Sequence, residues 1–178
     1  MLEIEKKYRL PEERRALVVA SLEAAGGVFE REDREENTIY GGGVLADTGA
    51  IIRIRRTATH SFLTYKRRIE DQSEVKQQIE YETKVSDPEA ADNIIRGLNL
   101  EPRLLYEKRR RIWKFRDVEV VIDVLPFGLF MEIEGSISSI KDVETLLGIN
   151  DLETEPETYP RLTERLGREV TGVIEARF

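Results

Sequence analysis

Two acidic residues and one basic residue alternate along the first segment of the chain, which reads MLEIEKKYRL. Glu3, Glu5 and Lys7 are two residues apart, so in a β-strand all three side chains point to the same face. That face presents carboxylate oxygens, which hard divalent cations prefer, beside an ammonium group that suits a phosphate oxygen. The spacing therefore predicts one side of a site that holds a metal ion and a phosphate group.

The segments that would position such a site are mostly strands, with a few helices between them. The helix signals are proline in a first turn, a capping Asp87 before Pro88, and glycine at two of the ends. We expect helices over 11–25, from 88 through 98, from 138 or 139 to 148, and a short one after Thr158. We expect strands over 2–9, 28–40, 50–57, 61–69, 74–86, 103–116, 118–125 and 128–136.

Charged side chains recur on one face of these strands. That face carries Glu3, Glu5, Lys7, Arg53, Arg55, Thr64, Lys66, Arg68, Lys76, Gln78, Glu80, Glu82, Lys84, Lys108, Arg110, Asp123, Glu132 and Glu134, and the other face of several strands is apolar. An ordinary sheet with its charged face in water is the simplest interpretation. Close pairs of like charge, such as Arg53 with Arg55, argue against it, because like charges repel unless an opposite charge lies between them.

A sheet of about eight antiparallel strands can close on itself, which would turn the charged face inward. Charges in a confined space must be paired, hydrated or bound to ions. A polyphosphate with divalent cations satisfies this condition, because bases meet its phosphoryl oxygens and acids meet its cations. The predicted fold class is α+β: an eight-stranded antiparallel β-barrel that forms a tunnel with a charged lumen, flanked by helices on the outside.

The composition limits other interpretations. The 178 residues carry 35 acidic and 28 basic side chains, a formal net charge of −7, which argues against a general nucleic-acid or anionic-membrane binder. The chain has no cysteine and a single histidine, His60, so a metal ion must lie on carboxylates. No stretch approaches the ~18 apolar residues of a membrane span, and no apolar signal segment opens the chain. We expect one cytoplasmic domain over 1–178.

Six blocks of the chain resemble the CYTH superfamily of triphosphate tunnel metalloenzymes, which includes class IV adenylyl cyclases and thiamine triphosphatases. The blocks are, in order, the E-x-E-x-K of residues 3–7, GAIIRIRR, LTYKR, QIEYET, KRRRIW and DVLPFGLFMEIE. They span about residues 2–136, which leaves 138–178 for C-terminal helices. The resemblance implies an eight-stranded antiparallel tunnel and a small-molecule substrate that contains a triphosphate.

The resemblance also implies roles for the matching residues. The triphosphate would be bound by Lys7, Arg53, Arg55, Lys66, Lys108 and Arg110. One or two ions of Mg²⁺ or Mn²⁺ would lie on Glu3, Glu5, Glu82, Asp123, Glu132 and Glu134. Glu5 and Glu80 are the candidate catalytic residues that would position water. Tyr40 is a third candidate, because it could reach the tunnel mouth; the alternative is an ordinary strand aromatic.

One departure from the family pattern bears on the reaction. Many relatives read R-x-E-x-E in the fifth strand, where this chain has Gln78 before Glu80 and Glu82. Lys76 or Lys84 would compensate for the missing charge, so Lys84 joins the candidate phosphate ligands. We expect hydrolysis of the terminal phosphate of inorganic tripolyphosphate, thiamine triphosphate or a nucleoside triphosphate. The alternatives are a class IV adenylyl cyclase, which makes cyclic AMP and pyrophosphate, and a non-catalytic polyphosphate or nucleotide sensor.

The sequence leaves three further features undecided. Trp113 and Phe115 suit either core packing or stacking on the organic part of a substrate. The last helix suits either the outer surface or the closure of one end of the tunnel. The sequence is silent on oligomeric state, and a homodimer is one alternative.

Overall fold

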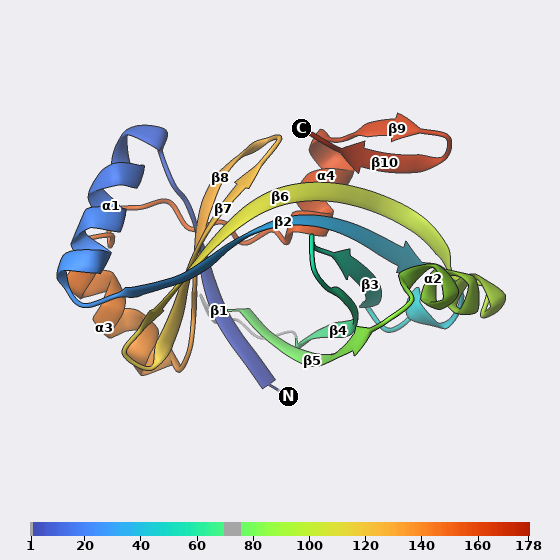
Figure 1. The fold of residues 1–178 in the computed structure, drawn as a ribbon, viewed down its shortest axis with the longest axis horizontal. Helices are drawn as coiled ribbons and strands as arrows, with labels where there is room; N and C mark the ends of the chain where they lie inside the picture. Colours follow the sequence, from blue (N-terminus) through green and yellow to red (C-terminus); the bar gives the residue numbers. More distant parts are fainter. Residues whose placement is uncertain (1, 70–75) are drawn as a thin grey trace.

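The computed structural model describes residues 2–69 and 76–178, which form one sheet of ten strands together with four α-helices (Figure 1). The strands are β1 (Leu2–Arg9), β2 (Val28–Gly41), β3 (Ala50–Arg56), β4 (Ser61–Ile69), β5 (Lys76–Val85), β6 (Glu101–Phe115), β7 (Val118–Leu125), β8 (Gly128–Glu134), β9 (Arg168–Val170) and β10 (Val173–Ala176). The helices are α1 (Glu12–Ala24), α2 (Pro88–Gly97), α3 (Ile137–Leu147) and α4 (Tyr159–Leu166), and a 3₁₀ turn, η1 (Gly43–Leu45), follows β2. Residues 74 and 75 of the predicted fifth strand, and the side chain of Lys76, lie outside the described part.

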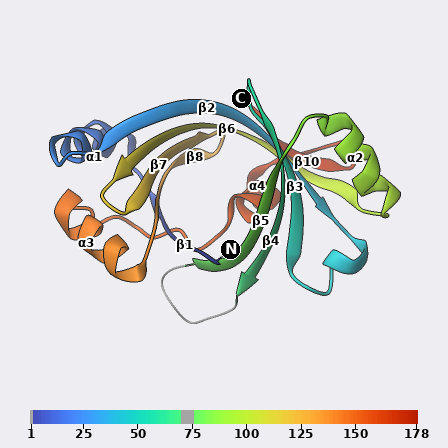
Figure 2. The same cartoon turned by 60° about the horizontal axis from the view of Figure 1, so that its bottom comes forward.

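Eight of the strands close into a ring, as predicted. Neighbours around the ring are antiparallel in the order β2-β3-β4-β5-β1-β8-β7-β6, and β6 pairs with β2 to complete it. In the closing pair, Val28 lies opposite Lys114 at one end and Gly41 lies opposite Glu101 at the other. Figure 2 shows β1, β5, β4 and β3 facing the arch of β2 and β6. Closure pairs each of the eight strands on both edges, which protects the sheet from edge-to-edge association.

The charged face of the sheet points into the ring, as the alternation in the sequence predicts. The registers place Lys7 opposite Glu132 and Lys66 opposite Glu80. Because residues two apart along a strand share a face, these pairs define the inward side of four strands. The interior is therefore ionic, and two of the three apolar cores lie outside the ring.

The largest apolar core lies between the ring and the helices α1 and α3, which run side by side in Figure 1. Leu22 of α1 and Ile140 of α3 are fully buried in it. Trp113 and Phe115 of β6 belong to the same core, with at most 2% of their surface exposed. The structure thus shows these two aromatic side chains packing in the core, and the stacking interpretation does not hold.

A second outer core lies under α2, which packs on β3 and β4. Asp87 caps this helix, as predicted, because its side chain accepts a hydrogen bond from a first-turn amide. Ala91 and Ile95 are buried, whereas Ile94 and Leu98 are 66% and 64% exposed. Ala91 and Ile95 are four residues apart and form a narrow stripe, and Ile94 lies about 100° around the helix from Ile95. Only this stripe reaches the sheet.

The third apolar core lies at one end of the ring, across which α4 is placed (Figure 2). Tyr159 and Leu162 of α4 pack there against the inward-facing Tyr106 and Phe130. Of the two positions left open for the last helix, this arrangement favours closure of one end of the ring. The strands β9 and β10 follow α4, and β10 pairs parallel to β6. Sequence analysis missed both, because three or four residues are too few to show an alternation.

The other predicted boundaries hold to within two residues. The helix α3 begins at Ile137, because Ser136 caps it by accepting a hydrogen bond from the amide of Ser139. It ends where Gly148 takes a left-handed backbone conformation, with φ of 62°. None of the helices in residues 2–69 and 76–178 is both long and apolar enough to cross a membrane.

Candidate functional site

A cavity of about 1080 Å³ lies inside the ring. Its walls include thirteen of the predicted site residues: Glu3, Glu5, Lys7, Tyr40, Arg53, Arg55, Lys66, Glu80, Glu82, Lys108, Arg110, Glu132 and Glu134. Asp123 is fully buried and contacts two of these bases. The structure therefore brings the acids and bases of six sequence blocks to one cavity, where three ionic clusters can be distinguished.

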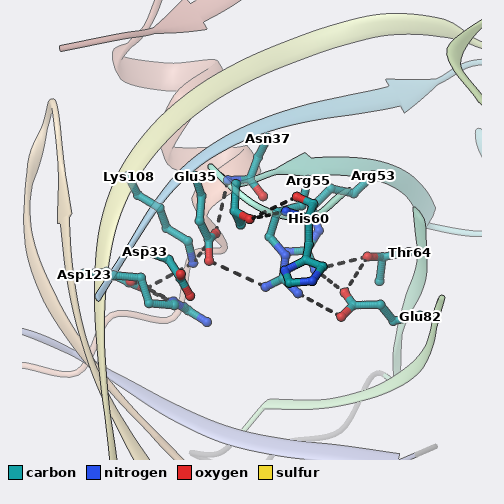
Figure 3. A network of polar contacts seen from close by, with 12 residues as sticks. Asp33, Glu35, Asn37, Arg53, Arg55, His60, Thr64, Glu82, Lys108 and Asp123 are labelled. Atoms are coloured by element: carbon teal, nitrogen blue, oxygen red, sulfur yellow. Dashed lines mark hydrogen bonds and ion pairs between the residues drawn. The ribbon is translucent and has the colours of Figure 1, made fainter. Parts of the chain in front are cut away.

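The first cluster joins β3, β4 and β5 (Figure 3). The carboxylate of Glu82 accepts hydrogen bonds from Nη2 of Arg53 at 3.2 Å and from Nη2 of Arg55 at 2.8 Å. The hydroxyl of Thr64 donates to the same carboxylate at 2.8 Å. The buried Nε atoms of both arginines have no hydrogen-bond partner within the described part of the chain. Each guanidinium is thus held in place, and its buried Nε is a donor that no acceptor in the described part of the chain satisfies.

The second cluster joins β1, β4 and β5. The ammonium of Lys66 lies 3.0 Å from Oε2 of Glu3 and also contacts the carboxylate of Glu80. The amide of Gln78 donates to Oε2 of Glu3 at 2.9 Å. Gln78, the residue that departs from the family pattern, therefore contacts a candidate metal ligand.

The third cluster joins β1, β6, β7 and β8. Arg110 bridges two acids: its Nε lies 2.8 Å from Oδ1 of Asp123, and its Nη2 lies 2.7 Å from Oε2 of Glu132. Lys7 lies 3.3 Å from Oε1 of Glu132, and Lys108 lies 3.4 Å from Oδ2 of Asp123. Every base of this cluster has an acidic partner, so charges of both signs are buried together without leaving one unpaired.

The strand β2 adds an acid that sequence analysis missed. Glu35 is 3% exposed, and its carboxylate lies 3.4 Å from Nζ of Lys108 and 3.6 Å from Nη1 of Arg55. Asn37, also buried, donates its Nδ2 to Glu35 at 3.4 Å. The sequence gives no periodic signal for this acid, because residues 30–37 of the predicted strand 28–40 are all polar.

Tyr159, at the start of α4, is the second residue that sequence analysis missed. Its hydroxyl donates to Oδ2 of Asp123 at 2.9 Å. The ammonium of Lys7 lies 3.7 Å from the centre of its ring, and that of Lys108 lies 5.3 Å away. Both distances suit cation–π attraction. No local pattern could have revealed this contact, because it depends on where α4 packs.

The carboxylates of this interior crowd one another. Burial, together with a hydrogen bond to Glu80, raises the pKa of Glu3 to about 7. Burial also raises the pKa of Glu134 to about 7, and repulsion from Glu3, Glu119 and Glu5 adds to this effect. A divalent cation would relieve that repulsion, and carboxylate oxygens are the ligands that Mg²⁺ and Mn²⁺ prefer.

The donor set therefore fits a divalent metal ion. Within residues 2–69 and 76–178, no three acidic or histidine side chains are already grouped as ligands of one ion. The bases hold several of these carboxylates instead, as the Lys66 contacts with Glu3 and Glu80 show. Binding an ion would thus require some of these acids to exchange a basic partner for the metal.

Two predicted site residues are placed differently from the others. The hydroxyl of Tyr40 donates to Asp92 of α2, and its fully buried ring packs in the outer core beside Ile54. This position favours the alternative that Tyr40 is an ordinary aromatic residue of the strand with a structural role. We therefore no longer assign it a catalytic role. Lys84 is exposed, its ammonium lies 5.9 Å from the ring centre of Phe62, and it is not among the residues that line the cavity.

A closed ring of antiparallel strands whose interior holds paired acids and bases defines a class of tunnel-shaped proteins that bind charged ligands inside the sheet. Comparison with known families identifies the class: the CYTH domain model matches residues 1–159. The chain belongs to the CYTH domain family, as its six sequence blocks predict.

Individual relatives agree with this assignment. The protein MJ0240 of Methanocaldococcus jannaschii, named as a candidate adenylate cyclase, is 33% identical over 152 residues, which cover 83% of this chain and 84% of that protein. The structure of PH1012 from Pyrococcus horikoshii is similar with a TM-score of 0.78 at 25% identity, covering 90% of this chain and 98% of that one. HpAC1 from Hippeastrum, described as a candidate adenylyl cyclase with a dominant triphosphatase activity, shares the fold with a TM-score of 0.68 at 16% identity, covering 97% and 99%.

Proposed function

We propose that this protein is a metal-dependent triphosphatase that hydrolyses the terminal phosphate of a triphosphate inside the ring. The observation that carries the proposal is the composition of the cavity, about 1080 Å³ in volume, in which several bases are each paired with an acid. Such a lining is costly to bury unless it serves a ligand that itself combines negative and positive charges. A triphosphate with a divalent cation is such a ligand.

The bases would bind the phosphoryl oxygens. Arg53 and Arg55 keep unpartnered Nε donors in the described part of the chain, and a guanidinium matches the geometry of a phosphate. The ammonium groups of Lys7, Lys66 and Lys108 would add point charges along the cavity. Phosphoryl transfer depends chiefly on such positioning and on neutralising the charge of the equatorial oxygens.

The acids would hold the cation and orient water. A bound Mg²⁺ or Mn²⁺ would neutralise the charge that develops on the phosphoryl oxygens. Glu3, Glu5, Glu132 and Glu134 are the ligands that we assign to it. Burial alone would raise the pKa of Glu80, but the hydrogen bond from Glu3 and the contact with Lys66 lower it. The carboxylate of Glu80 therefore stays ionised, which suits the positioning of water.

The reaction itself needs little covalent help from the chain. The oxygen of a water molecule bonds to the terminal phosphorus, and the bond from that phosphorus to its bridging oxygen breaks. The proton that water loses would pass to the carboxylate of Glu80 or Glu5. Orthophosphate leaves, and the remaining two phosphates stay with the other product.

Adenylyl cyclisation is the second candidate, and the name of the relative MJ0240 favours it. A cyclase needs a surface that holds the adenosine so that its ribose hydroxyl reaches the α-phosphate. Trp113 and Phe115, which could have stacked on the base, are buried in the outer core instead. Water needs no such surface, so hydrolysis requires fewer assumptions about this cavity.

Metal-dependent phosphate release tests the proposal. The purified protein is offered tripolyphosphate, thiamine triphosphate and ATP, each with Mg²⁺, with Mn²⁺ or with EDTA. We expect orthophosphate from at least one of them with a metal and none with EDTA. The variant Glu5→Gln should be inactive under all conditions. Release that persists in EDTA, or a fully active Glu5→Gln variant, would show that the cation site is wrongly assigned.

A further inference from the structure

Glu35 connects bases that belong to two different ionic clusters. Its carboxylate meets two bases from different strands: Nζ of Lys108 on β6 at 3.4 Å and Nη1 of Arg55 on β3 at 3.6 Å (Figure 3). β2 lies between these two strands, with Glu35 opposite Lys108 and Asn37 opposite Arg55. Glu35 thus stands where two ionic clusters meet: the one built on Glu82 and the one built on Asp123.

The surroundings keep Glu35 charged. Burial alone would raise its pKa, but the bases around it, Lys108 first and then Arg110, Arg55 and Arg53, lower the pKa to about 2. Only 3% of its surface is exposed, and Asn37 donates a hydrogen bond to it at 3.4 Å. The carboxylate is therefore ionised at neutral pH, and bases enclose it, whereas the crowded acids lie beside one another.

We propose that Glu35 is a positioning residue that holds Lys108 and Arg55 at a common distance from the phosphates of the substrate. The inference rests on the proposed function, because it takes both bases as phosphate ligands. Without an anion between them, the two side chains would repel each other and turn toward Asp123 and Glu82, their other acidic partners. Glu35 is itself no ligand of substrate or metal in this view.

The expected signature separates positioning from a loss of fold. The variant Glu35→Gln keeps the shape of the side chain and removes its charge, which makes the cavity more positive. We expect tripolyphosphate without metal to bind this variant at least as tightly as the wild type, at one molecule per chain. The kcat of metal-dependent hydrolysis should nevertheless fall at least tenfold. A merely structural role would lower the bound stoichiometry together with kcat.

Two further variants complete the experiment. Glu36→Gln removes the same charge from the next residue of β2, whose side chain pairs with Arg56 and Arg177 outside the clusters, and it should keep wild-type kcat and binding. Glu35→Asp keeps the charge but withdraws it by one methylene, so its kcat should lie between those of the wild type and Glu35→Gln. Calorimetry gives the affinity and stoichiometry, and phosphate release gives kcat.

The outcomes separate the two proposals. A wild type that hydrolyses no triphosphate contradicts the proposed function, and this inference with it. An active wild type with Glu35→Gln within threefold of Glu36→Gln in kcat overturns the inference alone. Should Glu35→Gln fail to fold, Glu35→Asp decides: a threefold or larger fall in kcat at full binding stoichiometry supports positioning, and wild-type kcat overturns it.

Discussion

The hydroxyl of Tyr159 donates a hydrogen bond of 2.9 Å to Oδ2 of Asp123, which ties the helix α4 to the strand β7 inside the ring. Asp123 has no exposed surface and also accepts a hydrogen bond from Nε of Arg110 at 2.8 Å. The ammonium of Lys7 lies over the ring of the same tyrosine. The closing helix and two candidate phosphate ligands thus share one anchoring contact.

This contact predicts a graded loss of stability. Tyr159→Phe removes the hydrogen bond and keeps the ring over Lys7, so the free energy of unfolding should fall by about 1–2 kcal/mol. Tyr159→Ala also removes the buried ring and should cost about 3–5 kcal/mol. Urea denaturation measures both, and Tyr81→Phe, on a tyrosine that is 64% exposed, is the matched control with no expected change. Equal effects of the Phe and Ala substitutions would show that packing of the ring contributes nothing.

Lys66 and Lys84 should differ in their effect on substrate binding. Lys66 lies among the candidate metal and catalytic acids, whereas Lys84 is exposed beside Phe62. A charge-assisted hydrogen bond is worth about 1.5–3 kcal/mol, so Lys66→Ala should raise the KM for tripolyphosphate by about 10- to 100-fold. Lys84→Ala removes the same charge and should change KM by less than about threefold. Steady-state kinetics on both variants give the two KM values. If Lys84→Ala raised KM as much as Lys66→Ala, Lys84 would also contact the phosphates.

Glu134 should oppose folding until a cation binds. Its pKa is raised by burial and by repulsion from Glu3, Glu119 and Glu5, so its charge is unfavourable in the metal-free protein. At pH 8 in EDTA, Glu134→Gln should therefore melt at a higher temperature than the wild type. This variant should also lose the stabilisation that Mn²⁺ gives the wild type. Loss of a residue that only supports a metal ligand can lower activity by about 100-fold, so loss of Glu134 as a ligand should lower turnover by more than that. Thermal melts with and without Mn²⁺ test this, and a lower melting temperature in EDTA would contradict it.

The ion pairs of Glu35 predict a specific dependence of stability on pH. Its pKa is about 2 in the folded protein, below the usual value of 4.5, so its contribution to stability is complete above pH 4.5. That contribution is lost as pH falls from 4.5 toward 2, because the unfolded chain binds the proton first. The difference in unfolding free energy between wild type and Glu35→Gln should thus shrink by about 1 kcal/mol between pH 6 and pH 3.5. A constant difference over this range would mean that Glu35 is not stabilised as an anion.

The sequence predicted the inward face of seven ring strands because charged side chains share one face of these strands and the opposite face of several is apolar. β2 hid its face, since the segment EREDREEN is polar at every position and alternation cannot separate its two sides. Register shifts between Phe29 and Arg31 and between Ile39 and Tyr40 add to this, because they change which residues share a face. This is why Glu35 was missed.

The role of α4 could not be predicted for a different reason. A helix of eight residues with apolar side chains on one face indicates that it packs, but not on which surface. Tyr159 reaches Asp123 only because α4 lies across the end of the ring, which depends on contacts with inward-facing Tyr106 and Phe130. Such contacts between distant segments leave no periodic signal in the chain.

The most direct test of the proposed hydrolysis is the identity of the phosphorus-containing products from ATP. Phosphorus-31 NMR follows the reaction with Mn²⁺, and the Glu5→Gln variant serves as the blank. We predict that orthophosphate and ADP appear in equal amounts, since water attacks the terminal phosphorus. Cyclic AMP with an equal amount of pyrophosphate would contradict the proposal and establish cyclisation as the reaction of this cavity.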